Sequence, residues 1–179
     1  YQSDQIAGRD LWAQLKTRVD LLMGNRESNG VYKGKSKYLM EDIKTPNQEQ
    51  MEHNLASMCS FQEAYPDIPM YMMLVPNAAN VLSDKLPSFA VTRDQDKDFA
   101  EIQKALKGHL TWVDVSSAMK DHKSENIYYH TDHHWTSLGA KYGYEALAEA
   151  LQLDTSKEVE LKPYAVSDSF NGTLSATSG

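Results

Sequence analysis

The sequence lacks the features that mark several large classes of protein. Cys59 is its single cysteine, so no internal disulfide can form and a disulfide-stapled scaffold is excluded. No run approaches the about 18 consecutive apolar residues that a transmembrane helix needs. Lysine and arginine are scattered and the formal net charge is -7, which argues against a nucleic-acid footprint. These absences leave a globular domain whose partners are not polyanions.

The remaining composition is that of one ordinary folded domain. Hydrophobic residues make up 41% of the chain and charged residues 24%. A length of 179 residues is enough for one domain with a real core and short for two. We therefore treat residues 1–179 as a single domain.

The pattern of apolar residues and breakers predicts alternating strands and helices. Gly34–Lys37 suits the turn of a hairpin, Thr45 and Pro46 suit a helix start, and the apolar run Met70–Val75 suits a strand buried on both faces of a parallel sheet. Predicted helices span 10–23, 46–65, 94–108 and 136–151, and predicted strands span 31–32, 38–40, 70–75, 110–115 and 159–161.

This order has a βαβ rhythm, which predicts an α/β fold with a parallel sheet flanked by helices. Ligands of such sheets bind beyond the carboxyl ends of the strands. The loop before the predicted helix 136–151 falls where that rule places a site.

That loop carries the densest proton-transfer chemistry in the chain. Three of the six histidines, His130, His133 and His134, fall within five residues, with Asp132 among them and Trp135 after them. Imidazole changes charge near neutral pH and is also the commonest metal ligand. A functional interpretation of the chain starts with this cluster.

Three interpretations of the cluster fit the residue types. Asp132 can orient His134 as a general base that activates a hydroxyl for acyl transfer, with His133 pointing to the opposite side. Alternatively, His130, Asp132 and His134 alternate along one face of an extended segment and bind a metal. In the third interpretation the histidines only satisfy hydrogen bonds in a partly buried turn.

Two neighbours have their own alternatives. Trp135 either walls a substrate pocket or plugs the following helix onto the sheet. Thr136 or Ser137 caps that helix, and we do not assign either as a nucleophile.

The motif Thr131–Thr136, with Asp132-His133-His134-Trp135 at its centre, resembles the signature of the bacterial DHHW protein family. It is also similar to the Asp-x-His-Trp motif of the alginate O-acetyltransferases, in the SGNH-hydrolase-like superfamily. The likeness continues over most of the chain, in Asp4–Asp10, Gly30–Gly34 with Tyr38-Leu39, Leu74–Pro76 with Leu86-Pro87, and Phe170–Leu174.

The resemblance implies a flavodoxin-like core and a carbohydrate O-acetyltransferase or acetylesterase outside the cytoplasm, secreted or anchored to the membrane. It implies Asp132 and His134 as the catalytic aspartate and histidine, with no metal or cofactor. Tyr129, His133 and Trp135 are expected to contact substrate. The expected partners are a carbohydrate polymer or cell-wall glycan and an acyl donor, a partner protein being one candidate for the donor.

The resemblance also implies a serine nucleophile after the histidine motif. Asp168-Ser169 superficially matches such a turn, but no apolar strand precedes it to project the serine. We therefore expect the serine and the C-terminal part of the domain to lie beyond Gly179. A non-catalytic glycan-binding or scaffold role is the further alternative if that serine is absent.

Overall fold

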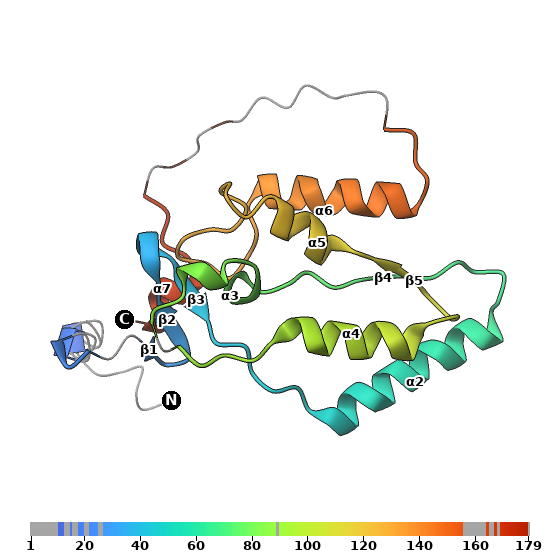
Figure 1. The fold of residues 1–179 in the computed structure, drawn as a ribbon, viewed down its shortest axis with the longest axis horizontal. Helices are drawn as coiled ribbons and strands as arrows, with labels where there is room; N and C mark the ends of the chain where they lie inside the picture. Colours follow the sequence, from blue (N-terminus) through green and yellow to red (C-terminus); the bar gives the residue numbers. More distant parts are fainter. Residues whose placement is uncertain are drawn as a thin grey trace.

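The computed structural model describes residues 11, 12, 15, 18, 19, 22–24, 27–88, 90–155, 164, 167 and 169–178. Its strands form two small sheets, and its helices lie between and around them (Figure 1). The strands are β1 Glu27–Ser28, β2 Val31–Lys33, β3 Leu39–Glu41, β4 Tyr71–Met73 and β5 Thr111–Val113. The α-helices are α2 Gln48–Ala64, α3 Ala78–Val81, α4 Gln95–Leu106, α5 Val115–Asp121, α6 Ser137–Ala150 and α7 Thr173–Ser178, and 3-10 turns span Lys35–Lys37 and Ser83–Lys85.

The parallel pair β4–β5 is the centre of the α/β arrangement. β4 and β5 pair in parallel, with Tyr71 opposite Thr111 and Met73 opposite Val113. Helices α5 and α6 lie on one side of this pair, and α2 and α4 lie on the other (Figure 1). The α/β fold with a parallel sheet between helices is therefore confirmed.

Strand β4 departs from the expected burial on both faces. Tyr71 is 36% exposed, and Val75 just after the strand is 40% exposed. Within the described residues β5 is the strand that pairs with β4, so the apolar run Met70–Val75 is covered only in part.

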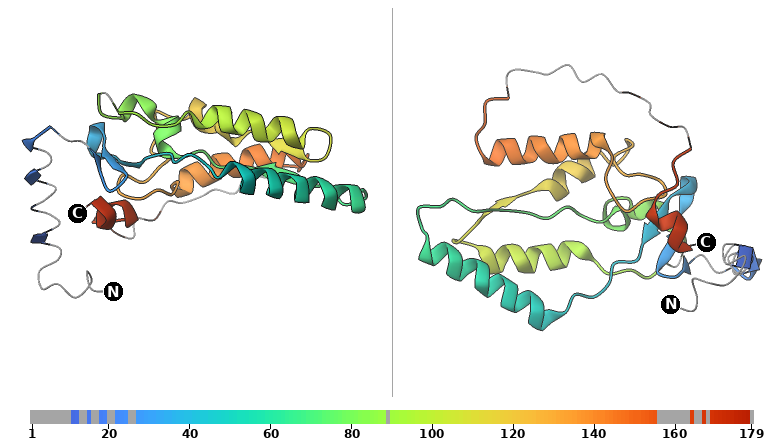
Figure 2. Two further views of the ribbon diagram at one scale, coloured as in Figure 1. Left: turned by 90° about the horizontal axis from the view of Figure 1, so that it is seen from below. Right: turned by 180° about the vertical axis from the view of Figure 1, so that it is seen from behind.

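The antiparallel sheet β1–β2–β3 stands at one end of the molecule. The predicted hairpin is confirmed, with Val31 opposite Glu41 and Lys33 opposite Leu39, while β1 was not predicted. Its connection runs over residues 34–38 and is therefore longer than a two-residue turn; within it Ser36 and Lys37 both take positive φ (55° and 64°). Two further views show α7 against this sheet (Figure 2).

Helix starts follow the chemistry of their capping residues. Thr136 caps α6 as expected, and Asp94 caps α4; each accepts a hydrogen bond from a backbone N–H of the first turn. The predicted cap of α2 at Thr45 is wrong. Asn47 caps it instead, because its Oδ1 accepts from the Gln50 N–H at 3.0 Å and Pro46 lies before the helix.

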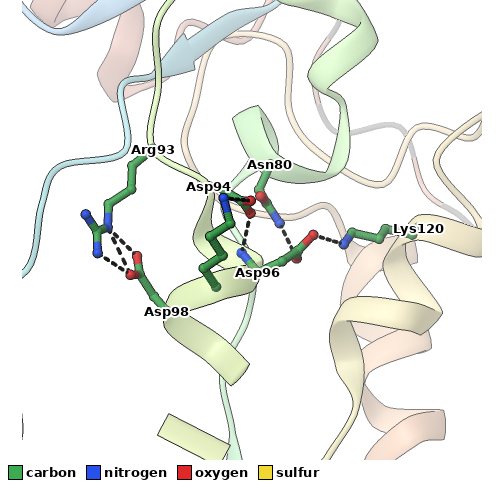
Figure 3. Close-up of polar contacts among 7 residues, drawn as sticks. Asn80, Arg93, Asp94, Asp96, Asp98 and Lys120 are labelled. Carbon is green, nitrogen blue, oxygen red and sulfur yellow. Dashed lines mark hydrogen bonds and ion pairs between the residues drawn. The ribbon is translucent and has the colours of Figure 1, made fainter. Parts of the chain in front are cut away.

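A polar network links residues of α3, α4 and α5 (Figure 3). Asp96 in α4 accepts from Asn80 in α3 at 2.8 Å and from Lys120 in α5. Burial alone would raise the pKa of Asp96, but these hydrogen bonds hold it below its ordinary value. Beside it, the Arg93 guanidinium makes a bidentate contact with the buried Asp98 carboxylate, which compensates that charge.

The main core lies under the candidate site. It joins β2, β3, α3, α5 and the start of the histidine loop. Fully buried side chains in it include Met40, Leu82, Met119, Ile127 and Tyr128. The site loop thus begins within the buried hydrophobic core of the described structure, at Ile127 and Tyr128.

Several predictions lie at the margins of the described chain. The described residues 11–22 of the predicted helix 10–23 are helical, but their apolar side chains are exposed, Leu11 by 71% and Leu22 by 87%. The Asp4–Asp10 motif and the predicted strand 159–161 lie outside the described residues. Among the described residues, no helix combines the length and apolar character needed to cross a membrane.

Candidate active site

The histidine motif sits on a closed loop between α5 and α6. The Thr136 N–H donates to the Ile127 carbonyl at 2.9 Å, and the Tyr129 N–H donates to the His134 carbonyl at 3.2 Å. Tyr128 is buried, and its hydroxyl donates to the Pro76 carbonyl at 2.7 Å, just after β4. Burial also raises the pKa of that phenol. The loop is therefore anchored at the carboxyl end of β4, where the sequence placed a site.

Asp132 and His134 are in direct contact. Asp132 Oδ1 lies 2.6 Å from His134 Nδ1 and accepts the His134 backbone N–H at 2.9 Å. Asp132 is buried at 6% exposure, whereas the His134 side chain is 64% exposed. The expected hydrogen bond between the two side chains is present, and the outer edge of the imidazole is open to a substrate.

The second carboxylate oxygen of Asp132 is held by a distant segment. Thr173, the first residue of α7, donates to Oδ2 from its backbone N–H at 2.9 Å and from its hydroxyl at 3.0 Å. Burial alone would raise the pKa of Asp132, but the hydrogen bonds from Thr173 and His134 hold it well below its usual range. Asp132 is therefore an ionised carboxylate at neutral pH.

Residues 170–175 run alongside the motif at close range. The Gly172 N–H donates to Thr131 Oγ1 at 3.0 Å, and a Cβ on Gly172 would lie 2.4 Å from the Cβ of Asp132. The sequence places Phe170–Leu174 within the family likeness but predicts no role for Thr173. The feature of this segment that could have indicated the contact is Gly172 followed by Thr173, because glycine allows a close backbone approach and threonine can donate a hydrogen bond.

His133 does not point away from the other two side chains, so that expectation is wrong. Its ring centroid lies 3.9 Å from that of His134, and its Nδ1 lies 2.9 Å from Thr173 Oγ1. The expectation assumed an extended segment, in which neighbouring side chains alternate. The loop bends here instead, because the Asp132 carboxylate accepts the backbone N–H two residues later, as in an Asx turn.

The other candidate residues surround this centre. The His130 ring stacks on Tyr38 at 3.9 Å between centroids, and burial together with the nearby Lys85 charge lowers the pKa of His130. The Tyr129 ring, partly exposed, lies 5.2 Å from that of Phe170. His130 is thus turned to Tyr38, and the described residues whose ligand atoms converge within 4.8 Å are Asp132, His133 and His134.

Trp135 packs on helix α6. A Cβ on Gly143 would lie 2.6 Å from its ring, and one on Gly139 would lie 3.0 Å from its Cβ. The ring also packs against the main core. The described contacts of Trp135 match the second alternative, in which its ring packs the following helix against the core. Its contact with substrate stays a prediction.

The arrangement can perform general base chemistry. A carboxylate that only accepts hydrogen bonds fixes the neutral imidazole of His134 as the Nδ1–H tautomer, leaving the Nε2 lone pair free to take a proton. Ser169, the described part of the Asp168-Ser169 match, is exposed and hydrogen-bonds Ser167 Oγ through its backbone N–H. The nucleophile expected beyond Gly179 stays a prediction.

The fold is similar to those of several solved structures. The O-acetyltransferase domain of Pseudomonas putida AlgJ matches with a TM-score of 0.65 and 21% identity, over 83% of this chain and 58% of that one. A DHHW family protein from Eubacterium siraeum matches with a TM-score of 0.65 and 26% identity, over 84% and 49%. Bacillus cereus PatB1 with a sulfonyl adduct matches with a TM-score of 0.57 and 22% identity, over 74% and 47%.

The chain thus spans about half the length of these structures. No relative was found among the curated proteins compared with it. Residues 33–178, which include the whole histidine loop and α7, match the family described as "SGNH hydrolase-like domain, acetyltransferase AlgX". The chain therefore belongs to this family of SGNH-hydrolase-like acetyltransferase domains.

Proposed function

We propose that the full-length protein containing this chain is an extracytoplasmic enzyme that transfers acetyl groups to carbohydrate or hydrolyses acetyl esters on it. The observation that carries the proposal is the contact between the buried Asp132 carboxylate and the exposed His134 imidazole, at 2.6 Å. Membership of an acetyltransferase family supports the acyl chemistry.

The chemistry follows a Ser-His-Asp scheme. A serine from beyond residue 179 attacks the acyl carbon of the donor, and His134 Nε2 takes the serine proton as the bond forms. Asp132 holds the tautomer and stabilises the imidazolium that results. His134 passes this proton to the leaving group of the donor, which departs and leaves the acyl-serine. A sugar hydroxyl or water then attacks the acyl-serine, giving its proton to His134, and His134 returns that proton to the serine oxygen as it leaves.

The acceptor is a carbohydrate polymer or a cell-wall glycan. The net charge of -7 disfavours strongly polyanionic polymers, so neutral glycan or peptidoglycan is the first choice to test. The acyl donor is a small acetyl ester or an acetylated partner protein. The proposed substrate contacts are residues near His134 in the sequence, namely Tyr129, His133 and Trp135.

The test is acetyl-ester hydrolysis and acetyl transfer by full-length protein with His134→Asn. Asparagine keeps a donor near the Nδ1 position, so the Asp132 contact is preserved while the base is removed. We expect a loss of about 10²–10⁴-fold, the range for removal of a general base. His53→Asn, an exposed residue of α2, is the matched control and should retain full activity.

Two results would contradict the acyl-transfer proposal. One is full activity in the His134→Asn protein, which would remove the base from the mechanism. The other is glycan binding by the wild type with no turnover of any acetyl ester, which would support a non-catalytic glycan-binding role.

A metal site is the second candidate, because ligand atoms of Asp132, His133 and His134 converge within 4.8 Å. Tetrahedral zinc with Zn–N bonds of about 2.0–2.1 Å needs its ligands roughly 3.3 Å apart, so the loop would have to contract. Both Nδ1 atoms are already hydrogen-bonded. Calorimetric titration with zinc tests this role. Binding of one ion that is lost in His133→Asn and kept in His130→Asn would support it, and absence of stoichiometric binding would refute it.

A further inference from the structure

One carboxylate holds two imidazoles in this site. Asp132 Oδ1 accepts from His134 Nδ1 at 2.6 Å. Asp132 Oδ2 accepts from the Thr173 hydroxyl at 3.0 Å, and the oxygen of that hydroxyl lies 2.9 Å from His133 Nδ1. His134 is therefore bound to Asp132 directly, and His133 is bound to it through Thr173.

The proton count fixes the tautomer of His133. An ionised carboxylate can only accept, so the single proton of the Thr173 hydroxyl goes to Asp132 Oδ2. The oxygen of that hydroxyl then offers lone pairs to His133, whose Nδ1 must carry the proton and donate it. The Nε2 atom of neutral His133 is left as a hydrogen-bond acceptor, as it is in His134.

The two acceptors lie side by side. The ring centroids of His133 and His134 are 3.9 Å apart with 36° between the planes. Both Nδ1 edges face Asp132 and Thr173, so both Nε2 edges are turned away from them. Side-chain exposures of 42% and 64% leave these edges accessible to a substrate.

We propose that these paired acceptors select a glycan with two adjacent hydroxyl groups, and that Thr173 is the positioning residue that makes the selection. This inference rests on the proposed function. One hydroxyl gives its proton to His134 Nε2 as its oxygen attacks the acyl-serine, while its neighbour donates a hydrogen bond to His133 Nε2. His133 takes no proton in the step, so it contributes orientation and acceptor specificity.

The first test is a readout of the tautomers by nitrogen NMR of the imidazoles in the full-length protein. We expect the Nδ1–H form for both His133 and His134. In Thr173→Val, which has the same shape without the hydroxyl, His133 should lose this preference while His134 keeps it. Thr173→Ser should restore it. An Nε2–H tautomer of His133 in the wild type would overturn the proposal whatever the enzyme acts on.

The second test compares acetyl transfer to two matched acceptors, a sugar with adjacent hydroxyls and its deoxy analogue lacking one of them. We expect the wild type to prefer the diol by about tenfold, the worth of one hydrogen bond to substrate. His133→Asn keeps a donor toward Thr173 but lacks the Nε2 lone pair, and its preference should fall to about one. Thr173→Val should lower the preference as well, and Thr173→Ser should recover it.

The outcomes separate this inference from the proposed function. Equal transfer to both acceptors by an active wild type refutes the diol selection and leaves the acetyltransferase standing. Failure of the wild type to turn over any acetyl donor, with both tautomers as expected, refutes the proposed function and the diol selection with it. A preference that survives His133→Asn assigns the selection to another residue and overturns the inference.

Discussion

Replacing Gly172 with alanine tests the packing that builds the site. The added Cβ would lie 2.4 Å from Asp132 Cβ, 2.6 Å from the Thr131 carbonyl oxygen and 2.7 Å from Asp132 Oδ2. Carbon atoms in ordinary contact are about 3.5–4.0 Å apart, so residues 172 and 173 must retreat by roughly 1 Å. That movement stretches the Thr173 N–H contact with Asp132, now 2.9 Å, beyond hydrogen-bonding range.

These contacts bound the loss in the free energy of unfolding that Gly172→Ala should cause. Overpacking costs about 1–3 kcal/mol, and a hydrogen bond to a charged group contributes about 1.5–3 kcal/mol. Alanine restricts the unfolded chain and returns about 0.4–1 kcal/mol. We expect Gly172→Ala to lower the free energy of unfolding by about 1.5–5.5 kcal/mol in urea denaturation, together with a loss of acetyl-ester turnover.

Gly108→Ala is the control for this substitution. Gly108 has a φ of +89° with nothing within 4 Å of an added Cβ, so alanine there costs about 1–2 kcal/mol of backbone strain. It lies between α4 and β5, and turnover should be unchanged. A Gly172→Ala protein as stable as the wild type would mean that segment 170–175 does not pack on Asp132, and the described site geometry would fail.

Three further predictions concern the site and its support. Tyr128→Phe removes the hydroxyl bonded to the buried Pro76 carbonyl and should cost about 1–3 kcal/mol in urea unfolding; a cost below 0.5 kcal/mol, taken as about the ordinary surface effect, would contradict the anchor. The pKa of Asp132 is lower in the folded protein than in the unfolded chain, so its stabilisation is present above about pH 4 and is lost as pH falls further. Unfolding measured between pH 6 and pH 3 should show this loss, and Asp132→Asn should flatten it. Gly143→Ala would place a Cβ 2.6 Å from the Trp135 ring, and a shift in tryptophan fluorescence with a fall in Tm should follow; an unchanged spectrum would refute the packing of Trp135 on α6.

Local signals in the sequence predicted much of the fold. The hairpin, β4, β5, α4 and α6 all appear near their predicted positions, because each is specified by an apolar pattern with breakers or capping residues at its ends. Short elements such as α3 and α5 were missed, since a helix of one or two turns has too few residues to show a period. Exposure of β4 could not be predicted, because burial depends on which neighbours cover a strand.

The candidate site was predicted only within its own segment. Asp132 and His134 are two residues apart, and their contact follows from local geometry. The position of His133 was wrong because the loop bends where an extended segment was assumed. Thr173 could not be found from the motif, since it meets Asp132 across 41 residues and only the folded chain brings them together.

The separation of Asp132 and Thr173 in the sequence determines when, during synthesis, the site can become ordered. During synthesis on the ribosome, Asp132 and the neighbouring histidines are made well before Thr173, whose backbone N–H and hydroxyl donate to Asp132 Oδ2. Until Thr173 has been made and α7 has docked, one carboxylate oxygen lacks its donors and His133 has no fixed proton. A nascent chain therefore carries every residue of the motif before its two imidazoles are ordered, and catalysis has to follow the synthesis and docking of the later segment.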